Sequence, residues 1–328
     1  MPKERFVGEL VAVGLASWAR RRRGPLYALV IYGALVAWSR EAGAADDPSP
    51  SEPAPANRTT KTPPVELRHD LAVDLAATAA LTATLVTWGL LIKPNLDAPS
   101  CVICDGPSGT VNPVDDFFRS SLRLPSDSPA SVISDVMAYG VAPSAGVALA
   151  ILVPLADGRG NEAALDILLV VQASLAFAVV QQGLSELFPR ERPATHFAEG
   201  DERARALAHH SSFESFPAGH NGSAFAIAAA SGTVATMRGY RLAPLVWAVG
   251  GALALTTSYL RIAADRHYFT DVAVGAGLGV GIGIAIPLLF HRPVNGERRS
   301  AAFGWLDGAT LTTSEVPGGR VVGIGKGF

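Results

Sequence analysis

Three short polar stretches hold many of the ionisable residues that lie among the long apolar runs of this chain. They read "SELFPRERP" (185–193), "SFPAGH" (215–220) and "RIAADRHYFTD" (261–271). Each stretch lies at the end of an apolar segment that is long enough to be a helix. We therefore expect all three to meet at one end of a helical bundle and to form a single site there.

The residue types in these stretches suit the transfer of a phosphoryl group. His267 and Asp271 are four apart, so on a helix the carboxylate would accept a hydrogen bond from one imidazole nitrogen and leave the other free to attack. His220 follows a Pro-Ala-Gly turn and is placed to protonate a leaving group. Arg192 and Arg261 carry planar, permanently charged guanidinium groups that fit phosphate oxygens.

The same stretches resemble the three-part signature of the type 2 phosphatidic acid phosphatase superfamily, which also includes vanadium haloperoxidases and bacterial acid phosphatases. That signature reads K-x6-R-P, then P-S-G-H, then S-R-x5-H-x3-D. The third block is complete here from Arg261 through His267 to Asp271, apart from its first residue, and the second block keeps Gly219 and His220. The resemblance covers about residues 130 to 290.

Two positions depart from the signature. Ser185 stands where the first block has Lys, although Arg192 and Pro193 are kept, and Ala218 replaces the Ser of the second block. Each change removes one expected contact to phosphate. Arg190 is a candidate for supplying the missing positive charge, although its spacing differs from that of the Lys.

The resemblance implies a mechanism that needs neither a metal ion nor a cofactor. His267 would attack phosphorus and form a phosphohistidine, with Asp271 as the residue that orients it. His220 would protonate the leaving oxygen and then activate water. The phosphate oxygens would be stabilised by Arg192, Arg261 and the backbone N–H of Gly219.

Composition and hydropathy predict an all-α fold, a membrane-associated bundle of about six helices. The chain has 328 residues, of which 49% are hydrophobic, and a formal net charge of −2, which argues against a nucleic-acid partner. Six runs have nearly the ~20 residues that cross a bilayer core. They are 75–92, 136–155, 167–185, 221–237, 242–260 and 272–290. A soluble all-helical protein is the alternative, because several runs are only weakly hydrophobic.

The sequence outside the bundle divides into segments of distinct composition. Residues 1–45 contain a basic cluster, an apolar stretch and small residues, which together indicate a signal peptide or an anchor. Residues 46–70 are rich in Pro and Ser and have the composition of a disordered linker. A helical phosphatase domain is expected over 71–291, and the tail 292–328 has a pattern that predicts a short hairpin around Pro317.

Smaller patterns yield further expectations. Gly275, Gly279 and Gly283 lie four apart and would let a neighbouring helix approach closely. The pair Cys101 and Cys104 is compatible with a local disulfide or with free thiols. The histidines 196, 209 and 210 lie in a polar loop and are expected to be solvated.

These features together predict a membrane phosphatase that acts on a lipid phosphate or pyrophosphate; no protein partner is indicated. The basic loop 238–241 and the basic residues after 290 favour a bacterial inner-membrane protein whose site faces the periplasm. A cleaved signal followed by six full spans would place the site on the opposite side, so the number of spans is the weaker prediction. Three alternatives stay open: a soluble periplasmic acid phosphatase, a vanadate-dependent haloperoxidase, and an inactive homologue that binds lipid phosphates.

Overall fold

A computed structural model describes residues 65–125, 129–294, 309–316 and 319–326 of the chain. Two compact units are distinguished, one made of residues 1–61 with 86–94 and the other of residues 62–85 with 95–328. The described part of the first unit holds the end of α3 (Leu71–Thr87), a π-helical turn Trp88–Ile92 and the start of a 3-10 turn Lys93–Asn95. The predicted signal peptide or anchor lies outside the described residues.

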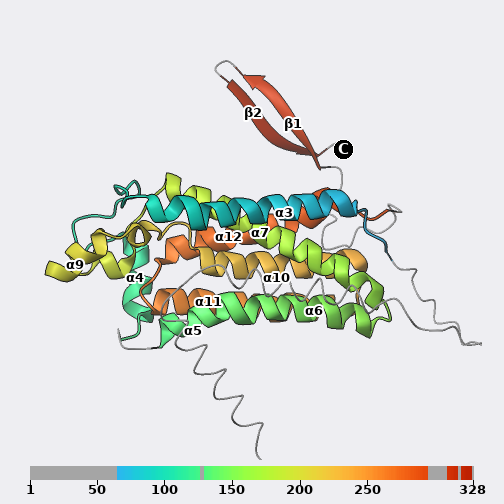
Figure 1. Cartoon of the computed structure of the whole chain (residues 1–328), viewed down its shortest axis with the longest axis horizontal. Helices are drawn as coiled ribbons and strands as arrows, with labels where there is room; N and C mark the ends of the chain where they lie inside the picture. The colour runs from blue at the N-terminus through green and yellow to red at the C-terminus, as the bar shows by residue number, and fades with distance from the viewer. Residues whose placement is uncertain (1–64, 126–128, 295–308, 317–318, 327–328) are drawn as a thin grey trace, which may run out of the picture. The chain divides into compact units, whose positions relative to one another are not determined.

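The second unit is a bundle of long helices that run side by side (Figure 1). Its helices are α5 (Ala130–Val136), α6 (Ala142–Ala156), α7 (Ala163–Leu187), α10 (Gly219–Arg238), α11 (Ala243–Ala263) and α12 (Phe269–Phe290), with a π-helical turn Met137–Val141 between α5 and α6. α10 packs against α6, α7, α11 and α12. The predicted all-α bundle is confirmed, and each of the six apolar runs is largely helical.

Five helical segments of the described chain are long and apolar enough to cross a membrane. They are Leu71–Asn95, Ala130–Ala156, Gly160–Leu187, Ala243–Ala263 and Phe269–Phe290. α10 is not among them, because it is rich in Ala, Gly, Ser and Thr. Most of its side chains are buried against the surrounding helices, so it needs small residues that allow close packing more than it needs large apolar ones.

The glycines of α12 confirm the predicted close approach of two helices. A Cβ added at Gly275, Gly279 or Gly283 would overlap a backbone carbonyl oxygen of α10 or of the residue before it. The backbones of α10 and α12 therefore pack directly on one another, which fixes the start of α12 next to the start of α10.

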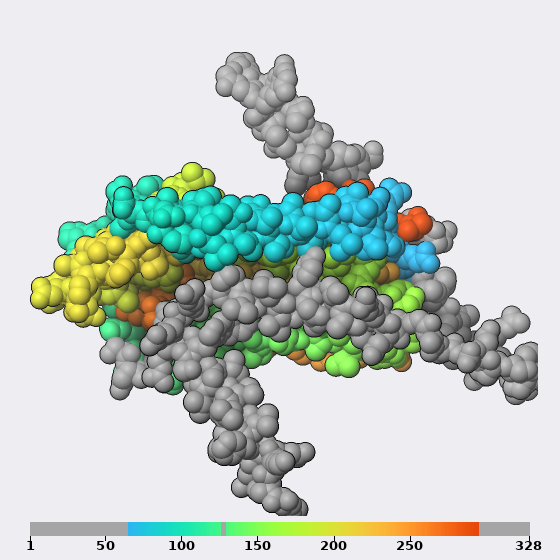
Figure 2. Space-filling model, viewed as in Figure 1, coloured from blue at the N-terminus to red at the C-terminus, as the bar shows by residue number. Residues whose placement is uncertain are grey.

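Short helices and loops cover the end of the bundle where α10 and α12 begin. They are α4 (Pro113–Leu122), α8 (Pro193–His196), α9 (Gly200–Leu207) and a 3-10 turn His210–Phe213. Figure 2 shows α9 and its surroundings, in yellow, at the surface of this end. Arg119 of α4 donates two hydrogen bonds to Asp265, from Nε at 2.7 Å and from Nη2 at 2.8 Å. These bonds tie α4 to the loop between α11 and α12.

The opposite end of the bundle contains a buried ion network. Arg238, in the last turn of α10, bonds Asp166 of α7 and Glu162, and the Tyr240 hydroxyl donates to Asp166 at 2.7 Å. Gly239 ends α10 in the left-handed conformation at φ +70°, which glycine adopts without strain. Of the two arginines in the basic loop 238–241, Arg238 is thus buried and paired, whereas the side chain of Arg241 is 76% exposed.

Two boundaries of the domain prediction can be compared with the structure. Leu67 is buried and forms a bridge with Pro293, and the Arg68 N–H donates to the Arg292 carbonyl. Residues 66–68, at the end of the predicted linker, therefore pair with the segment after α12. The predicted hairpin is present, with β1 (Ala309–Val316) antiparallel to β2 (Gly319–Lys326).

Candidate active site

The three polar stretches meet at one end of the bundle, as expected. The Ala218 N–H donates to the Asp271 carbonyl at 3.1 Å, which joins the second stretch to the third. The Ala194 N–H, just after the first stretch, donates to the Asp265 carbonyl at 3.1 Å. These backbone contacts hold the loop before α8, the start of α10 and the start of α12 together.

His267 is buried at the centre of this arrangement, with a residual exposure of 2%. Its Nδ1 lies 2.7 Å from the Ser215 carbonyl oxygen, which can only accept, so Nδ1 carries the proton. Its Nε2 lies 3.3 Å from Nη2 of Arg261. Burial, followed by the charges of Arg261 and Arg192, holds the pKa of His267 well below its usual value. The imidazole is thus neutral, with the lone pair of Nε2 facing the arginine.

The structure corrects the expected role of Asp271 as a direct partner of His267. Asp271 accepts from Arg190 Nη1 at 2.7 Å, from the Ser215 hydroxyl at 2.6 Å and from the Tyr268 N–H at 2.9 Å. His267 precedes α12, which begins at Phe269, so the four-residue helical spacing does not apply to this pair. Asp271 reaches His267 through Ser215, a residue that no motif indicated, and through the N–H of the neighbouring Tyr268.

Arg261, in the last turn of α11, connects His267 to a residue that no motif indicated. Its Nη1 donates to Asp135 Oδ1 at 2.9 Å and to the Ser134 hydroxyl at 3.0 Å. The same Asp135 oxygen lies 3.3 Å from Nε2 of His220, whose ring centroid is 6.5 Å from that of His267. Both histidines, Arg261 and Asp135 therefore surround one small region.

Arg192 and Gly219 lie at two helix starts beside this region. Arg192 precedes α8, and its side chain donates to the Ser211 carbonyl at 2.8 Å. Burial lowers its pKa, but a guanidinium remains charged at any physiological pH. Gly219 is the first residue of α10, where backbone N–H groups have no partner within the helix and favour an anion.

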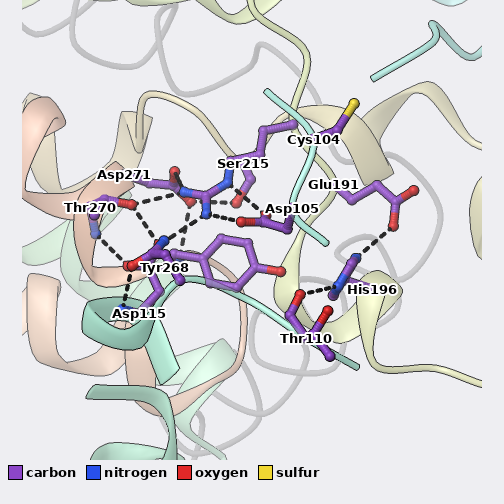
Figure 3. A network of polar contacts seen from close by, with 12 residues as sticks. Cys104, Asp105, Thr110, Asp115, Glu191, His196, Ser215, Tyr268, Thr270 and Asp271 are labelled. Atoms are coloured by element: carbon purple, nitrogen blue, oxygen red, sulfur yellow. Dashed lines mark hydrogen bonds and ion pairs between the residues drawn. The ribbon is translucent and has the colours of Figure 1, made fainter. Parts of the chain in front are cut away.

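Arg190 is committed to a buried network of carboxylates instead of the region around the histidines. Figure 3 shows these carboxylates, Asp105, Asp115 and Asp271, close together. Its guanidinium bonds Asp105 at 2.8 and 3.0 Å, Asp115 at 2.9 Å, Asp271 at 2.7 Å and the Thr270 hydroxyl at 2.8 Å. Although burial opposes it, these partners raise the pKa of Arg190. The structure thus gives no support to Arg190 as a substitute for the missing Lys, because three carboxylates already surround its charge.

Asp115 anchors this network from α4. Burial alone would raise its pKa, but hydrogen bonds from the Thr270 N–H, from Arg190 and from the Thr270 hydroxyl outweigh that effect and lower it. The carboxylate is therefore ionised and fully buried. Thr270 and Asp271 are the second and third residues of α12, so the network fixes the beginning of that helix.

The polar loop is more ordered than the sequence suggested. The expectation of a solvated His196 is wrong, because its side chain is buried between Glu191 and the Thr110 carbonyl (Figure 3). Cys101 and Cys104 form a disulfide. The Val102 N–H between them donates to the Pro189 carbonyl at 2.8 Å, next to Arg190.

One group of side chains in the described part of the chain has the spacing to hold a metal ion: Glu186, His210 and Glu214. His210 Nδ1 donates to the Asp97 carbonyl at 3.0 Å, and Nε2 lies 3.2 Å from Glu186. Although burial opposes it, these bonds raise the pKa of His210. Both ring nitrogens of His210 are thus engaged by contacts within the chain.

The two departures from the signature differ in their surroundings. Ala218 is fully buried and precedes α10 without a side-chain bond to the helix start. Ser185 lies in α7 with 3% exposure, and its hydroxyl has no hydrogen-bond partner. Neither position carries a charge that could replace the Lys of the signature.

Residues 164–294 match the family model of the PAP2 superfamily. This segment is therefore similar to the PAP2 superfamily. It contains every residue of the three polar stretches, whereas Asp135 and Ser134 lie before it. No curated protein matches the chain.

One solved structure is similar to the chain, the "first transmembrane PAP2 type phosphatidylglycerolphosphate phosphatase from Bacillus subtilis". The two sequences are 19% identical, and the alignment covers 66% of this chain and 91% of that one with a TM-score of 0.39. The similarity to the PAP2 superfamily rests on the match of residues 164–294 and on the three polar stretches that they contain.

Proposed function

We propose that the chain is a membrane phosphatase that hydrolyses a lipid phosphate or pyrophosphate through a phosphohistidine at His267. The similarity to the PAP2 superfamily supports phosphatase chemistry in general. Five helices of suitable length and hydropathy support a location in the membrane.

The observation that carries the proposal is the state of His267. The Ser215 carbonyl holds the proton on Nδ1, and the pKa is lowered, so Nε2 is an unprotonated nucleophile. Arg261 lies beside that nitrogen and is placed to stabilise the charge of a phosphoryl group that Nε2 attacks.

The remaining residues fill the other steps. Nε2 of His267 forms a bond to phosphorus while the bond from phosphorus to the lipid oxygen breaks, and His220 gives that oxygen its proton. The negative charge of the bound phosphate favours the protonated form of His220 beforehand. A water molecule then attacks phosphorus, His220 takes a proton from it, and the bond to Nε2 breaks. Inorganic phosphate and neutral His267 result, and Arg192, Arg261 and the Gly219 N–H stabilise the phosphate oxygens throughout.

The surface beside Asp135 supports a substrate with an apolar tail. Val132, Val136 and Tyr139 are 66%, 55% and 57% exposed, although each is a large apolar residue in or just after α5. Exposed apolar residues of this density mark contact with lipid or with an apolar ligand. A substrate whose phosphate binds Arg261 would have its tail close to this face.

Hydrolysis can be tested with purified protein in detergent and a panel of phosphatidic acid, phosphatidylglycerophosphate, undecaprenyl pyrophosphate and lipid A. We expect phosphate release by the wild type and none by His267→Ala, with His209→Ala as the matched control because His209 is exposed. An acid-labile phosphoryl label that is trapped on His267 during turnover would support the phosphohistidine intermediate. Equal phosphate release by wild type and His267→Ala would refute the mechanism, and bromide oxidation that depends on added vanadate would favour a haloperoxidase.

We also propose that the site faces the periplasm from the bacterial inner membrane. The basic loop after α10 lies at the other end of the bundle, and basic loops favour the cytoplasm. Cysteine introduced at Glu202 of α9 should react with a membrane-impermeant maleimide in intact spheroplasts, and cysteine at Arg241 only after permeabilisation. The reverse labelling would overturn this orientation.

A further inference from the structure

Asp135 holds a carboxylate oxygen between two residues of the proposed mechanism, Arg261 and His220. Oδ1 accepts from Nη1 of Arg261 at 2.9 Å and lies 3.3 Å from Nε2 of His220. The other terminal nitrogen of the same guanidinium, Nη2, faces Nε2 of His267. One carboxylate oxygen of Asp135 thus contacts both Arg261 and His220. The guanidinium that binds this oxygen also faces His267.

Arg261, which bonds Asp135, is buried, whereas Asp135 itself is half-exposed. The side chain of Arg261 is 3% exposed and His267 is 2% exposed, so both are enclosed by the bundle. The side chain of Asp135 is 46% exposed. Its displacement would therefore not require the core to open, and Arg261 would keep its bond to the Ser134 hydroxyl at 3.0 Å.

The charges at the site also favour displacement of the Asp135 carboxylate by a bound phosphate. A phosphate and the Asp135 carboxylate would repel each other if both contacted Arg261. The site has no Lys at position 185 to offset that repulsion. Both anions cannot be bound well at once, so the binding of phosphate requires Asp135 to leave.

We propose that Asp135 is a built-in competitor of phosphate, which occupies the anion position between Arg261 and His220 until a substrate displaces it. The inference rests on the proposed function, because it assumes that the same position receives the substrate phosphate. A lipid substrate recovers the cost of displacement through apolar contacts near Val132 and Tyr139. Inorganic phosphate has no tail, so Asp135 weakens its binding and speeds its release as a product.

The test measures binding of inorganic phosphate to the full-length protein in detergent by isothermal titration calorimetry, alongside inhibition of lipid hydrolysis by phosphate. Asp135→Asn keeps the shape and removes the charge, and Asp135→Ser is a second variant that removes the carboxylate. Asp116→Asn is the matched control, because Asp116 is exposed on α4. We expect both Asp135 variants to bind phosphate about fivefold more tightly than the wild type, near the upper end of what the loss of an exposed ion pair changes. Asp116→Asn should bind like the wild type.

The outcomes separate this inference from the proposed function. If the wild type hydrolyses lipid and both Asp135 variants bind phosphate as tightly as the wild type or more weakly, the role of Asp135 as a competitor is overturned. The proposed function would stand. A fall in kcat with unchanged phosphate affinity would also overturn the competitor role, because Asp135 would then position His220. If no protein bound phosphate and none hydrolysed any lipid, the proposed function would fail and the inference with it.

Discussion

The carbonyl oxygen of Ser215 accepts a hydrogen bond from Nδ1 of His267 at 2.7 Å. The hydroxyl of the same serine donates to Asp271 at 2.6 Å, and Asp271 in turn accepts from Arg190. The position and tautomer of His267 are therefore set by a backbone group, and the carboxylate acts one residue removed. Asp271 is a positioning residue in this arrangement.

Asp271→Asn should lower kcat without a comparable change in KM. The amide cannot accept from Ser215, Tyr268 and Arg190 as the carboxylate does, so the loop that carries the Ser215 carbonyl would shift. We expect a loss of about 100-fold in kcat, within the range for the removal of one element of general acid–base catalysis. Steady-state kinetics on a soluble short-chain lipid phosphate would measure it.

Ser215→Ala is the matched comparison for Asp271→Asn. It keeps the carbonyl that holds His267 and removes only the hydroxyl bond to Asp271. Its loss in kcat should be much smaller than that of Asp271→Asn. Equal losses in the two variants would mean that the serine hydroxyl, and not its carbonyl, positions His267.

The pH dependence of kcat/KM should reflect a neutral His267. Its pKa is lowered from the usual 6.5, chiefly by burial and then by Arg261 and Arg192. A group with a lowered pKa stays unprotonated as the pH falls through its ordinary value, and is protonated only at more acid pH. Once the ionisation of the substrate has been subtracted, kcat/KM should therefore not decline on acidification until the pH is well below 6.5. A decline centred at or above 6.5 that is assigned to His267 would contradict this environment.

Substitution of Arg190 should mainly lower stability, whereas substitution of Arg192, two residues away, should mainly lower kcat/KM. Arg190→Gln removes the cation shared by Asp105, Asp115 and Asp271, and unpaired buried carboxylates cost about 3–5 kcal/mol in the free energy of unfolding. Arg192→Gln should leave most of the stability but reduce kcat/KM about 100-fold, by loss of a charge that stabilises the transition state. Denaturation in detergent and steady-state kinetics on both variants would compare them. A stable Arg190→Gln protein with weakened phosphate binding would reassign Arg190 to the phosphate site.

The bundle was predictable because its signals are local. Apolar runs of helical length marked α6, α7, α11 and α12. The four-residue glycine spacing predicted that α12 packs closely against a neighbouring helix, which in the structure is α10. The pairing of residues 66–68 with 292–294 was not predictable, because it depends on residues more than 200 positions away. A Pro-rich composition upstream carries no information about that pairing.

The site was predictable in its motif residues and not in their partners. His267, His220 and Arg261 stand in a recognisable pattern, but the Ser215 carbonyl is a backbone group that any residue could provide. Asp135 lies 126 positions from Arg261, in a segment with no motif. The role of Arg190 depends on three carboxylates from separate segments, so its position beside Arg192 was misleading about its function.

Gly279 should tolerate no side chain, because its Cβ would overlap the Gly222 carbonyl and crowd Phe225 of α10. Gly279→Ala should therefore push α12 away from α10, with a loss of about 1–3 kcal/mol in the free energy of unfolding, as for other overpacked sites. Gly281→Ala is the matched control, since a Cβ there meets nothing within 4 Å and alanine favours the helix. Since α12 carries Asp271 at its start, Gly279→Ala should also lower kcat, whereas Gly281→Ala should leave both quantities near those of the wild type. Equal stability of the two variants would show that α10 and α12 do not pack backbone against backbone.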